Sequence, residues 1–132
     1  MAAGLFYVYT DPGTVDETEF HDWYDHEHGP ARLTVPGLGP AYRYRALDEL
    51  KPEWLALYEL DRPDVIDSPA YKELSTKASD RDKAVGAGLA GPEVLEDPGY
   101  RAAVSTPWRD RVVASALWRE RRVFGLRNAL GA

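Results

Sequence analysis

Hydrophobic residues occur along this chain in short strand-like runs separated by turn signals. Residues 4–10 are mostly aromatic and aliphatic and end in an Asp-Pro-Gly turn, which is typical of a strand buried on both faces. Residues 41–47 alternate between apolar and arginine side chains, and residues 53–60 form another strand-like run. These two runs are predicted to pair as an antiparallel hairpin, and a last strand is expected at residues 122–127.

A helical pattern follows the first strand. Residues 14–17 have the Thr-x-x-Glu form of a capping box, which predicts a helix start. Phe20, Trp23 and Tyr24 then fall on one face at helical spacing, and the Gly29-Pro30 pair is expected to stop or kink the helix.

The second half of the chain has further, shorter helical patterns. A helix is expected from Pro69 to about residue 77, and a second short one at 80–89. Residues 90–99 are rich in Gly and Pro and are predicted to be a loop. Thr106-Pro107 resembles a helix start and precedes an apolar helical face.

This order of elements, strand, helix, strand, strand, helix, strand, predicts an α+β fold of ferredoxin-like topology. Residues 1–132 are expected to form this single domain, since domains commonly run to roughly 100–150 residues. Four strands would make an antiparallel sheet with helices on one face, the first and last strands being central neighbours. Apolar residues at both parities of the strands predict a second buried face, which a homodimer would provide.

Composition narrows the class of protein. The formal net charge of −6 disfavours nucleic-acid partners, because the phosphate backbone attracts positive surfaces. The chain has no cysteine, hence no disulfide framework and no thiolate nucleophile. No run approaches the ~20 apolar residues of a membrane span, and the start lacks a signal-peptide pattern, so a cytoplasmic protein without a membrane partner is expected.

Charge is unevenly distributed along the chain. Residues 11–28 contain seven acidic side chains and no lysine or arginine, whereas residues 109–132 contain six arginines and two acidic side chains. The two ends are therefore expected to attract each other within one fold, in preference to forming a basic patch for nucleic acid.

All three histidines lie near the end of the first predicted helix. His21, Asp25 and His28 are spaced i, i+4 and i+7 and would share one face of an α-helix, where Tyr24 also neighbours His28. Imidazole exchanges protons near neutral pH, a carboxylate can hold its tautomer, and a phenol can stabilise an enolate. The expected catalytic residues are His28 as proton carrier, with His26, Asp25 and Tyr24. In the alternative, His26 and His28 only cap the C-terminal end of the helix, Tyr24 belongs to the core and Asp25 is solvated.

Substrate contacts are expected from the strands. Arg43 would hold an anionic or phenolate substrate, and Tyr7, Tyr44 and Trp54 would belong to an aromatic lining for a flat hydrophobic ligand. In the alternative, Arg43 lies on a dimer edge or pairs with the acidic helix, and the aromatic residues are core. No metal or other cofactor is expected, since the histidine spacing is not a strong metal signature and no phosphate-binding loop or Ser-His-Asp signature is present.

One motif, at residues 20–33, reads FHDWYDHEHGPARL, and Val-Pro-Gly at 35–37 and Arg-Tyr-Arg at 43–45 follow it. Together these segments resemble the EthD-like group of the dimeric α+β barrel superfamily. The resemblance implies a homodimer of ferredoxin-like units with a pocket in each half-barrel. Residues 83–107 are longer than that pattern, and an extra helical segment is predicted before the last strand.

The superfamily that this chain resembles includes isomerases, cyclases, lyases and oxygenases, so fold alone does not select a reaction. The leading hypothesis is a small-molecule enzyme of secondary metabolism that performs cofactor-independent acid–base chemistry on an aromatic or polyketide-like intermediate. Cyclisation, isomerisation and elimination are the expected reaction types. One alternative is a non-catalytic dimeric ligand-binding or accessory protein, and another is a haem-dependent or cofactor-free monooxygenase.

Overall fold

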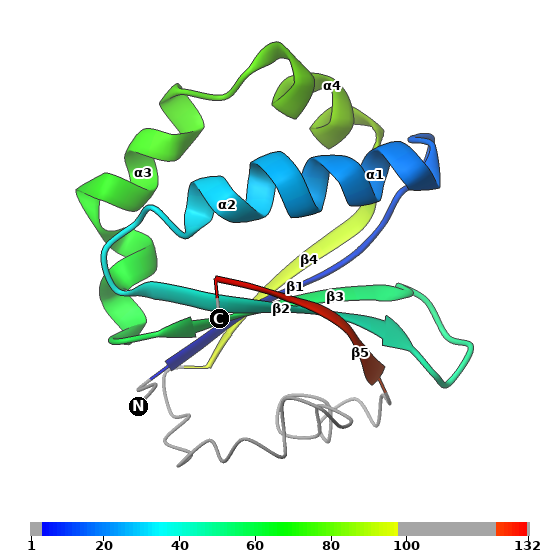
Figure 1. Ribbon diagram of the computed structural model, residues 1–132, viewed down its shortest axis with the longest axis horizontal. Coiled ribbons are helices and arrows are strands. Elements are labelled where there is room, and N and C mark those ends of the chain that lie inside the picture. Colours follow the sequence, from blue (N-terminus) through cyan, green and yellow to red (C-terminus); the bar gives the residue numbers. More distant parts are fainter. Residues whose placement is uncertain (1–3, 98–123, 132) are drawn as a thin grey trace.

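The computed structural model of the protein describes residues 4–97 and 124–131. These residues form an α+β fold in which helices lie on one side of an open antiparallel sheet (Figure 1). In chain order the elements are β1 (Gly4–Asp11), α1 (Glu17–Trp23), the π-helix η1 (Tyr24–His28), α2 (Gly29–Arg32), β2 (Leu38–Ala46), β3 (Trp54–Leu60), the 3-10 helix η2 (Pro63–Asp67), α3 (Pro69–Thr76), α4 (Asp80–Gly88), β4 (Ala90–Asp97) and β5 (Phe124–Leu130).

The sheet has the strand order β4-β1-β3-β2-β5, and all neighbouring strands are antiparallel. Its first four strands follow an order compatible with a ferredoxin-like fold, and β2 and β3 form the predicted hairpin. These four strands correspond to the predicted four-stranded antiparallel sheet, and β5 adds a fifth strand to it beside β2. The predicted last strand is this β5, and it lies beside β2 at the outer edge rather than beside β1.

The predicted loop at 90–99 is also wrong, because residues 90–97 form β4 and pair with β1. Gly91 and Pro92 misled the sequence argument, since both are breakers within a central strand. β4 is an edge strand, however, and its register against β1 shifts between Tyr9 and Asp11. An edge strand with a shifted register tolerates a proline, which has no N–H to donate.

The first helix anchors to the sheet through aromatic side chains, as its pattern predicts. Phe20, Trp23 and Tyr24 are all at most 3% exposed and belong to the core cluster that includes Phe6 and Tyr58 of the sheet. The predicted cap moves by two residues: the side chain of Asp16, rather than Thr14, accepts a hydrogen bond at the N-terminus of α1. Acidic side chains in the first turn, including Glu17 and Glu19, suit the positive end of the helix dipole.

The helix does not stop at Gly29-Pro30. It runs from α1 through the π turn η1 into α2, which ends at Arg32. The Gly29 N–H donates to the Tyr24 carbonyl, five residues earlier, which is the bond that defines a π turn. Pro30 then falls in the first turn of α2, where its missing N–H is tolerated.

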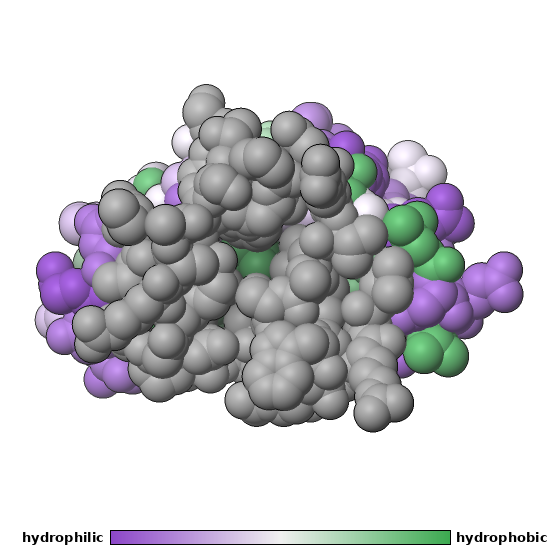
Figure 2. All heavy atoms as spheres, turned by 90° about the horizontal axis from the view of Figure 1, so that it is seen from below, coloured by the Kyte–Doolittle hydropathy of each residue, from purple (hydrophilic) through white to green (hydrophobic). Residues whose placement is uncertain are grey.

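The sheet carries buried side chains on both faces. Alternate residues of β2 and β3, namely Tyr42, Tyr44, Leu55 and Leu57, are at most 2% exposed but lie outside the helix-side core cluster. Strands buried on both faces are what their sequence predicts. The exposed large apolar residues of the described chain are Leu47 and Leu50, in the connection after β2, and Figure 2 shows hydrophobic surface at the end of the molecule where that hairpin lies.

Several expectations lie outside the described residues. They are the helix expected from residue 107, most of the extra segment predicted before the last strand, and five of the six arginines counted near the C-terminus. The sixth, Arg127 of β5, does contact the acidic helix through Asp25. Within residues 4–97 and 124–131, no helix has the length and apolar character needed to span a membrane.

Candidate functional site

A pocket of about 190 Å³ lies between the first helix and the sheet. Its lining is mostly aromatic and aliphatic and comes from β1, β3, α3 and all three segments of the helix: Phe6, Val8, Thr10, Trp23, Tyr24, His28, Arg32, Tyr58, Tyr71 and Leu89. A second hollow shares Trp23, His28, Arg32 and Leu89 with it and extends toward α3 and α4. His28 and Arg32 therefore stand where the two spaces meet.

The π turn determines where His28 lies. Its ring centroid is 4.3 Å from that of Trp23 and 4.9 Å from that of Tyr24, so the imidazole packs over the two aromatic anchors of the helix. An α-helix would have placed His28 on the same face as His21 and Asp25. That predicted shared face is wrong, because five residues of wider π geometry lie between Trp23 and Gly29.

His28 is a neutral imidazole over the whole physiological range. Loss of hydration, followed by the positive charges of Arg32 and Arg43, lowers the pKa of His28 to about 3, and the nearby Asp82 opposes this only in part. Among the described residues no hydrogen bond is made by either ring nitrogen. His28 thus offers an unprotonated nitrogen to a ligand without first losing a proton.

Two buried phenols face each other beside His28. The Tyr58 hydroxyl donates to the Tyr24 hydroxyl at 3.5 Å, a long hydrogen bond. Burial raises the pKa of Tyr24 and raises that of Tyr58 further. Both side chains are therefore neutral, and Tyr24, whose proton is not used in this bond, can donate a hydrogen bond to an oxygen atom in the pocket.

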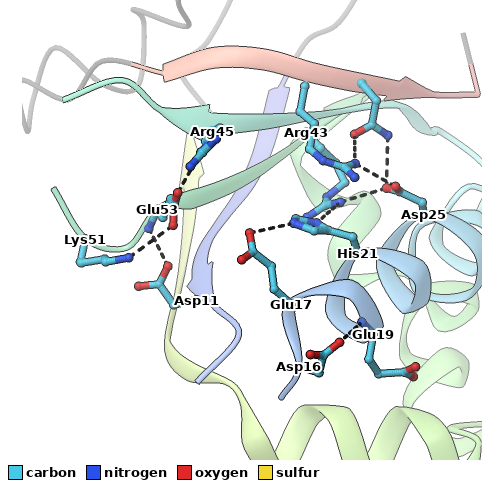
Figure 3. A network of polar contacts seen from close by, with 12 residues as sticks. Asp11, Asp16, Glu17, Glu19, His21, Asp25, Arg43, Arg45, Lys51 and Glu53 are labelled. Carbon is cyan, nitrogen blue, oxygen red and sulfur yellow. Dashed lines mark hydrogen bonds and ion pairs between the residues drawn. The ribbon is translucent and has the colours of Figure 1, made fainter. Parts of the chain in front are cut away.

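Asp25 points away from this pocket and holds the edge of the sheet. Its carboxylate accepts hydrogen bonds from Arg43 at 3.0 Å, Arg127 at 2.9 Å and Asn128 at 3.2 Å (Figure 3). Burial opposes ionisation, but the hydrogen bonds from Arg127 and Arg43 outweigh it and lower the pKa of Asp25. Asp25 is a partly buried, ionised partner for arginine, and the structure does not bring it to His28.

Arg43 is enclosed rather than available to a ligand. Its side chain is 2% exposed, and its guanidinium lies 4.4 Å from the centroid of the Tyr24 ring. It also lies 3.1 Å from His21 Nδ1, and because arginine can only donate, this nitrogen accepts. The His21 proton is then on Nε2, which faces Glu17 at 3.5 Å. This matches the alternative interpretation, in which Arg43 pairs with the acidic helix.

The remaining predicted site residues are scattered. His26 is exposed on the helix, and Trp54 packs against His21 with 4.3 Å between ring centroids. Tyr44 is buried outside the helix-side core, away from the pocket. Tyr7 lies in β1 opposite Leu57, and its side chain is outside the described set. Of the eight predicted residues, the pocket brings together Tyr24 and His28.

Two charged side chains at the pocket and its outer hollow, Arg32 and Asp82, were not predicted from the sequence. Arg32 follows His28 by four residues, a spacing that signals a shared helix face, but the expected stop at Gly29-Pro30 concealed it. No sequence signal could have identified Asp82, which approaches the helix through tertiary contact.

Helix α4 is joined to the first helix by polar contacts. Asp82 accepts from the Trp23 indole N–H at 2.8 Å. Arg81 contacts the carboxylates of Glu19, Asp22 and Glu27 at 2.6, 2.7 and 3.4 Å. These contacts hold α4 at the side of the pocket and fix the indole of Trp23 in its wall.

Among the described residues, no group of three or more His, Cys, Asp or Glu side chains could hold a metal ion. Comparisons with protein-family models, curated proteins and solved structures gave no match. The resemblance to the EthD-like group therefore stays a prediction.

Proposed function

We propose that the protein is a small-molecule enzyme that performs cofactor-independent acid–base chemistry on an aromatic or polyketide-like intermediate. The observation that carries this proposal is the neutral His28, held against Tyr24 in the wall of an apolar pocket. The aromatic lining suits a flat ligand, and the paired phenols suit a ligand oxygen.

The chemistry follows from these groups. An unprotonated His28 nitrogen takes a proton from a carbon next to a substrate carbonyl, and the carbonyl oxygen becomes an enolate that a tyrosine hydroxyl stabilises. The imidazolium so formed is poorly hydrated and lies near Arg32, so it returns its proton readily. Return to a different substrate atom completes an isomerisation and leaves the protein unchanged.

Exchange of carbon-bound hydrogen for deuterium tests the proposal without a known product. Benzoylacetone, an aromatic diketone, is incubated with the protein in D₂O, and its exchange is followed by NMR. His28→Gln is expected to lower the protein-dependent rate about 100-fold or more, the scale of general acid–base catalysis. His26→Gln, at an exposed position, is the matched control. Equal rates for the protein and for His28→Gln would contradict the proposal.

A non-catalytic ligand-binding protein is the second candidate. It is favoured by the pKa of about 3 for His28, which makes the free imidazole a weak base, and by the separation of Asp25 and His26 from the pocket. This candidate predicts saturable binding of aromatic ligands with no exchange above background. The oxygenase alternative stays a prediction.

The homodimer and the closed barrel also stay predictions. The sheet face that would pair carries Leu55 and Leu57, which are already at most 1% exposed in a single chain. The need to bury this face therefore supports a dimer less strongly than the apolar pattern of the strands suggests. Light scattering at micromolar concentration decides between a monomer and a dimer.

A further inference from the structure

Arg32 differs from the other arginines in the described part of the chain. Each of the others forms an ion pair with at least one carboxylate: Arg43, Arg45, Arg62, Arg81 and Arg127. The Arg32 side chain has no hydrogen bond or ion pair within residues 4–97 and 124–131, although its backbone carbonyl accepts from the Val35 N–H at 3.0 Å. It is partly buried at the end of α2, and it lines both the pocket and the outer hollow.

The acidic group on the same side is already engaged. Asp82 accepts from the Trp23 indole at 2.8 Å and from the Ser79 backbone N–H at 3.0 Å of its capping box, and it makes no ion pair with Arg32. The Asp82 oxygens are therefore directed to Trp23 and Ser79.

The other polar groups that line the inner pocket with Arg32 are uncharged, whereas Lys83 lines the outer hollow beside it. His28 is neutral, and the buried phenols of Tyr24 and Tyr58 keep their protons. The positive charge of Arg32 acts on all three, since it lowers the pKa of each. An arginine that lines an apolar pocket and is not paired with a carboxylate of the protein can bind an anionic group of a ligand.

We infer that this pocket takes a carboxylate-bearing ligand, in which the carboxylate binds the Arg32 guanidinium and an aromatic body lies against Trp23, Tyr24 and Phe6. The planar guanidinium can donate two parallel hydrogen bonds to a carboxylate. This inference names the substrate class of the proposed enzyme and rests on the same pocket, but it concerns binding and does not require turnover.

The inference also gives His28 a more effective role. A bound carboxylate would offset the charge of Arg32, one of the causes that keep His28 unprotonated, while the charges of Arg43 and Asp82 stay in place. The imidazole then becomes a stronger base when the ligand is present than when the pocket is empty.

A pair of probes that differ in charge tests the inference. The carboxylate 2-naphthoate and the neutral 2-naphthalenemethanol share one aromatic body, and calorimetry at neutral pH measures the affinity of each. The protein is expected to bind 2-naphthoate about tenfold more tightly or better, since a hydrogen bond to a charged group contributes on that order. Arg32→Gln should remove this preference and leave the affinity for 2-naphthalenemethanol unchanged.

Controls separate the local effect from net charge and from folding. Arg62→Gln removes one positive charge from an exposed side chain paired with Asp64 and should keep the preference. Arg32→Lys keeps the positive charge but cannot donate two parallel hydrogen bonds from a planar group, so it should retain part of the preference for 2-naphthoate. Equal affinity for both probes, no binding of either at millimolar concentration, or equal losses in Arg32→Gln and Arg62→Gln would overturn the inference. If His28→Gln loses deuterium exchange but keeps the preference for 2-naphthoate, both the proposed function and the carboxylate inference are supported. If the unchanged protein shows the preference but does not exchange benzoylacetone, only the carboxylate inference is supported.

Discussion

Arginine side chains have two distinct environments in this molecule. Arg43 is enclosed by aromatic rings and neutralised by Asp25, a pair whose loss of hydration is offset by several hydrogen bonds. Arg32 lies at the end of α2, in the helix layer, and has no such partner among the described residues. Sequence alone could not assign these roles, because only the fold shows which of the two arginines a carboxylate reaches.

Acid is expected to destabilise the protein through its histidines. The unfolded chain binds a proton on His28 near the ordinary pKa of 6.5, whereas the folded chain does so only near 3. Between these values the unfolded state holds more protons, so the free energy of unfolding falls as pH falls, by up to ~1.4 kcal/mol per pH unit for this group. Burial and the charge of Arg43 lower the pKa of His21 too, so it acts in the same direction.

Urea unfolding at about pH 7, 6 and 5 measures this dependence above the range in which most carboxylates titrate. His28→Gln should flatten the slope of stability against pH, and the exposed His26→Gln is the matched control. A slope that is identical in the protein and in His28→Gln would show that the imidazole takes up its proton equally in both states.

The first helix shows how far the sequence could predict an element. Its start, to within two residues, and its aromatic anchors follow from helical spacing and acidic residues in the first turn, whereas its continuation past Gly29-Pro30 to Arg32 was not predicted. The π turn could not be predicted, because five residues with ordinary helix propensity carry no signal for an i→i+5 bond. The prediction therefore identified His28 and Tyr24 correctly as neighbours but grouped them wrongly with Asp25.

Two glycines in helices are expected to respond to alanine with opposite signs. At Gly29 a new Cβ would lie 2.8 Å from the Tyr24 carbonyl oxygen and 2.5 Å from Leu130 Cδ1, and the carbonyl cannot move without disturbing the π turn. Gly29→Ala should therefore lower the free energy of unfolding by about 1–3 kcal/mol, the scale of overpacking. At Gly86 in α4 a Cβ would meet nothing within 4 Å, so Gly86→Ala should raise it by roughly 0.5–1 kcal/mol.

Denaturant unfolding of the two variants measures both values. A stabilising Gly29→Ala would mean that the helix relaxes to ordinary α geometry at that position. A destabilising Gly86→Ala would mean that α4 packs more closely than its open surroundings indicate.

The whole molecule combines a predictable layer arrangement with an unpredicted strand order. The order of elements and the hairpin of β2 and β3 were sufficient to predict an α+β fold with helices on one face. The edges of the sheet were not predictable, because edge pairing depends on which backbone groups are left unbonded rather than on side-chain pattern. Both β4 and β5 are such edge strands.

A disulfide can test the order of strands, since the natural chain has no cysteine. Val8 and Val94 are opposite each other on β1 and β4, so Val8→Cys with Val94→Cys should oxidise to an intramolecular disulfide. Val8→Cys with Leu130→Cys is the control, because β3 and β2 separate β1 from β5 by about 14 Å. Mass spectrometry without reductant detects the bond. A disulfide in the control pair alone would contradict the strand order, because it would place β5 rather than β4 beside β1.

Because of the π turn, the orientation of the pocket residues depends on the number of residues in the first helix. The π turn accommodates one extra residue, so the residues of α2 point in the directions they would have in an α-helix that is one residue shorter. If the same residues formed an unbroken α-helix, α2 would be rotated about the helix axis by about 100° relative to α1. Straightening the turn would carry Arg32 away from Trp23 and Tyr24, whereas deleting one residue between Tyr24 and Gly29 would leave both flanks in place. A single-codon deletion is thus a smaller change to this pocket than a set of substitutions that favours the ideal helix.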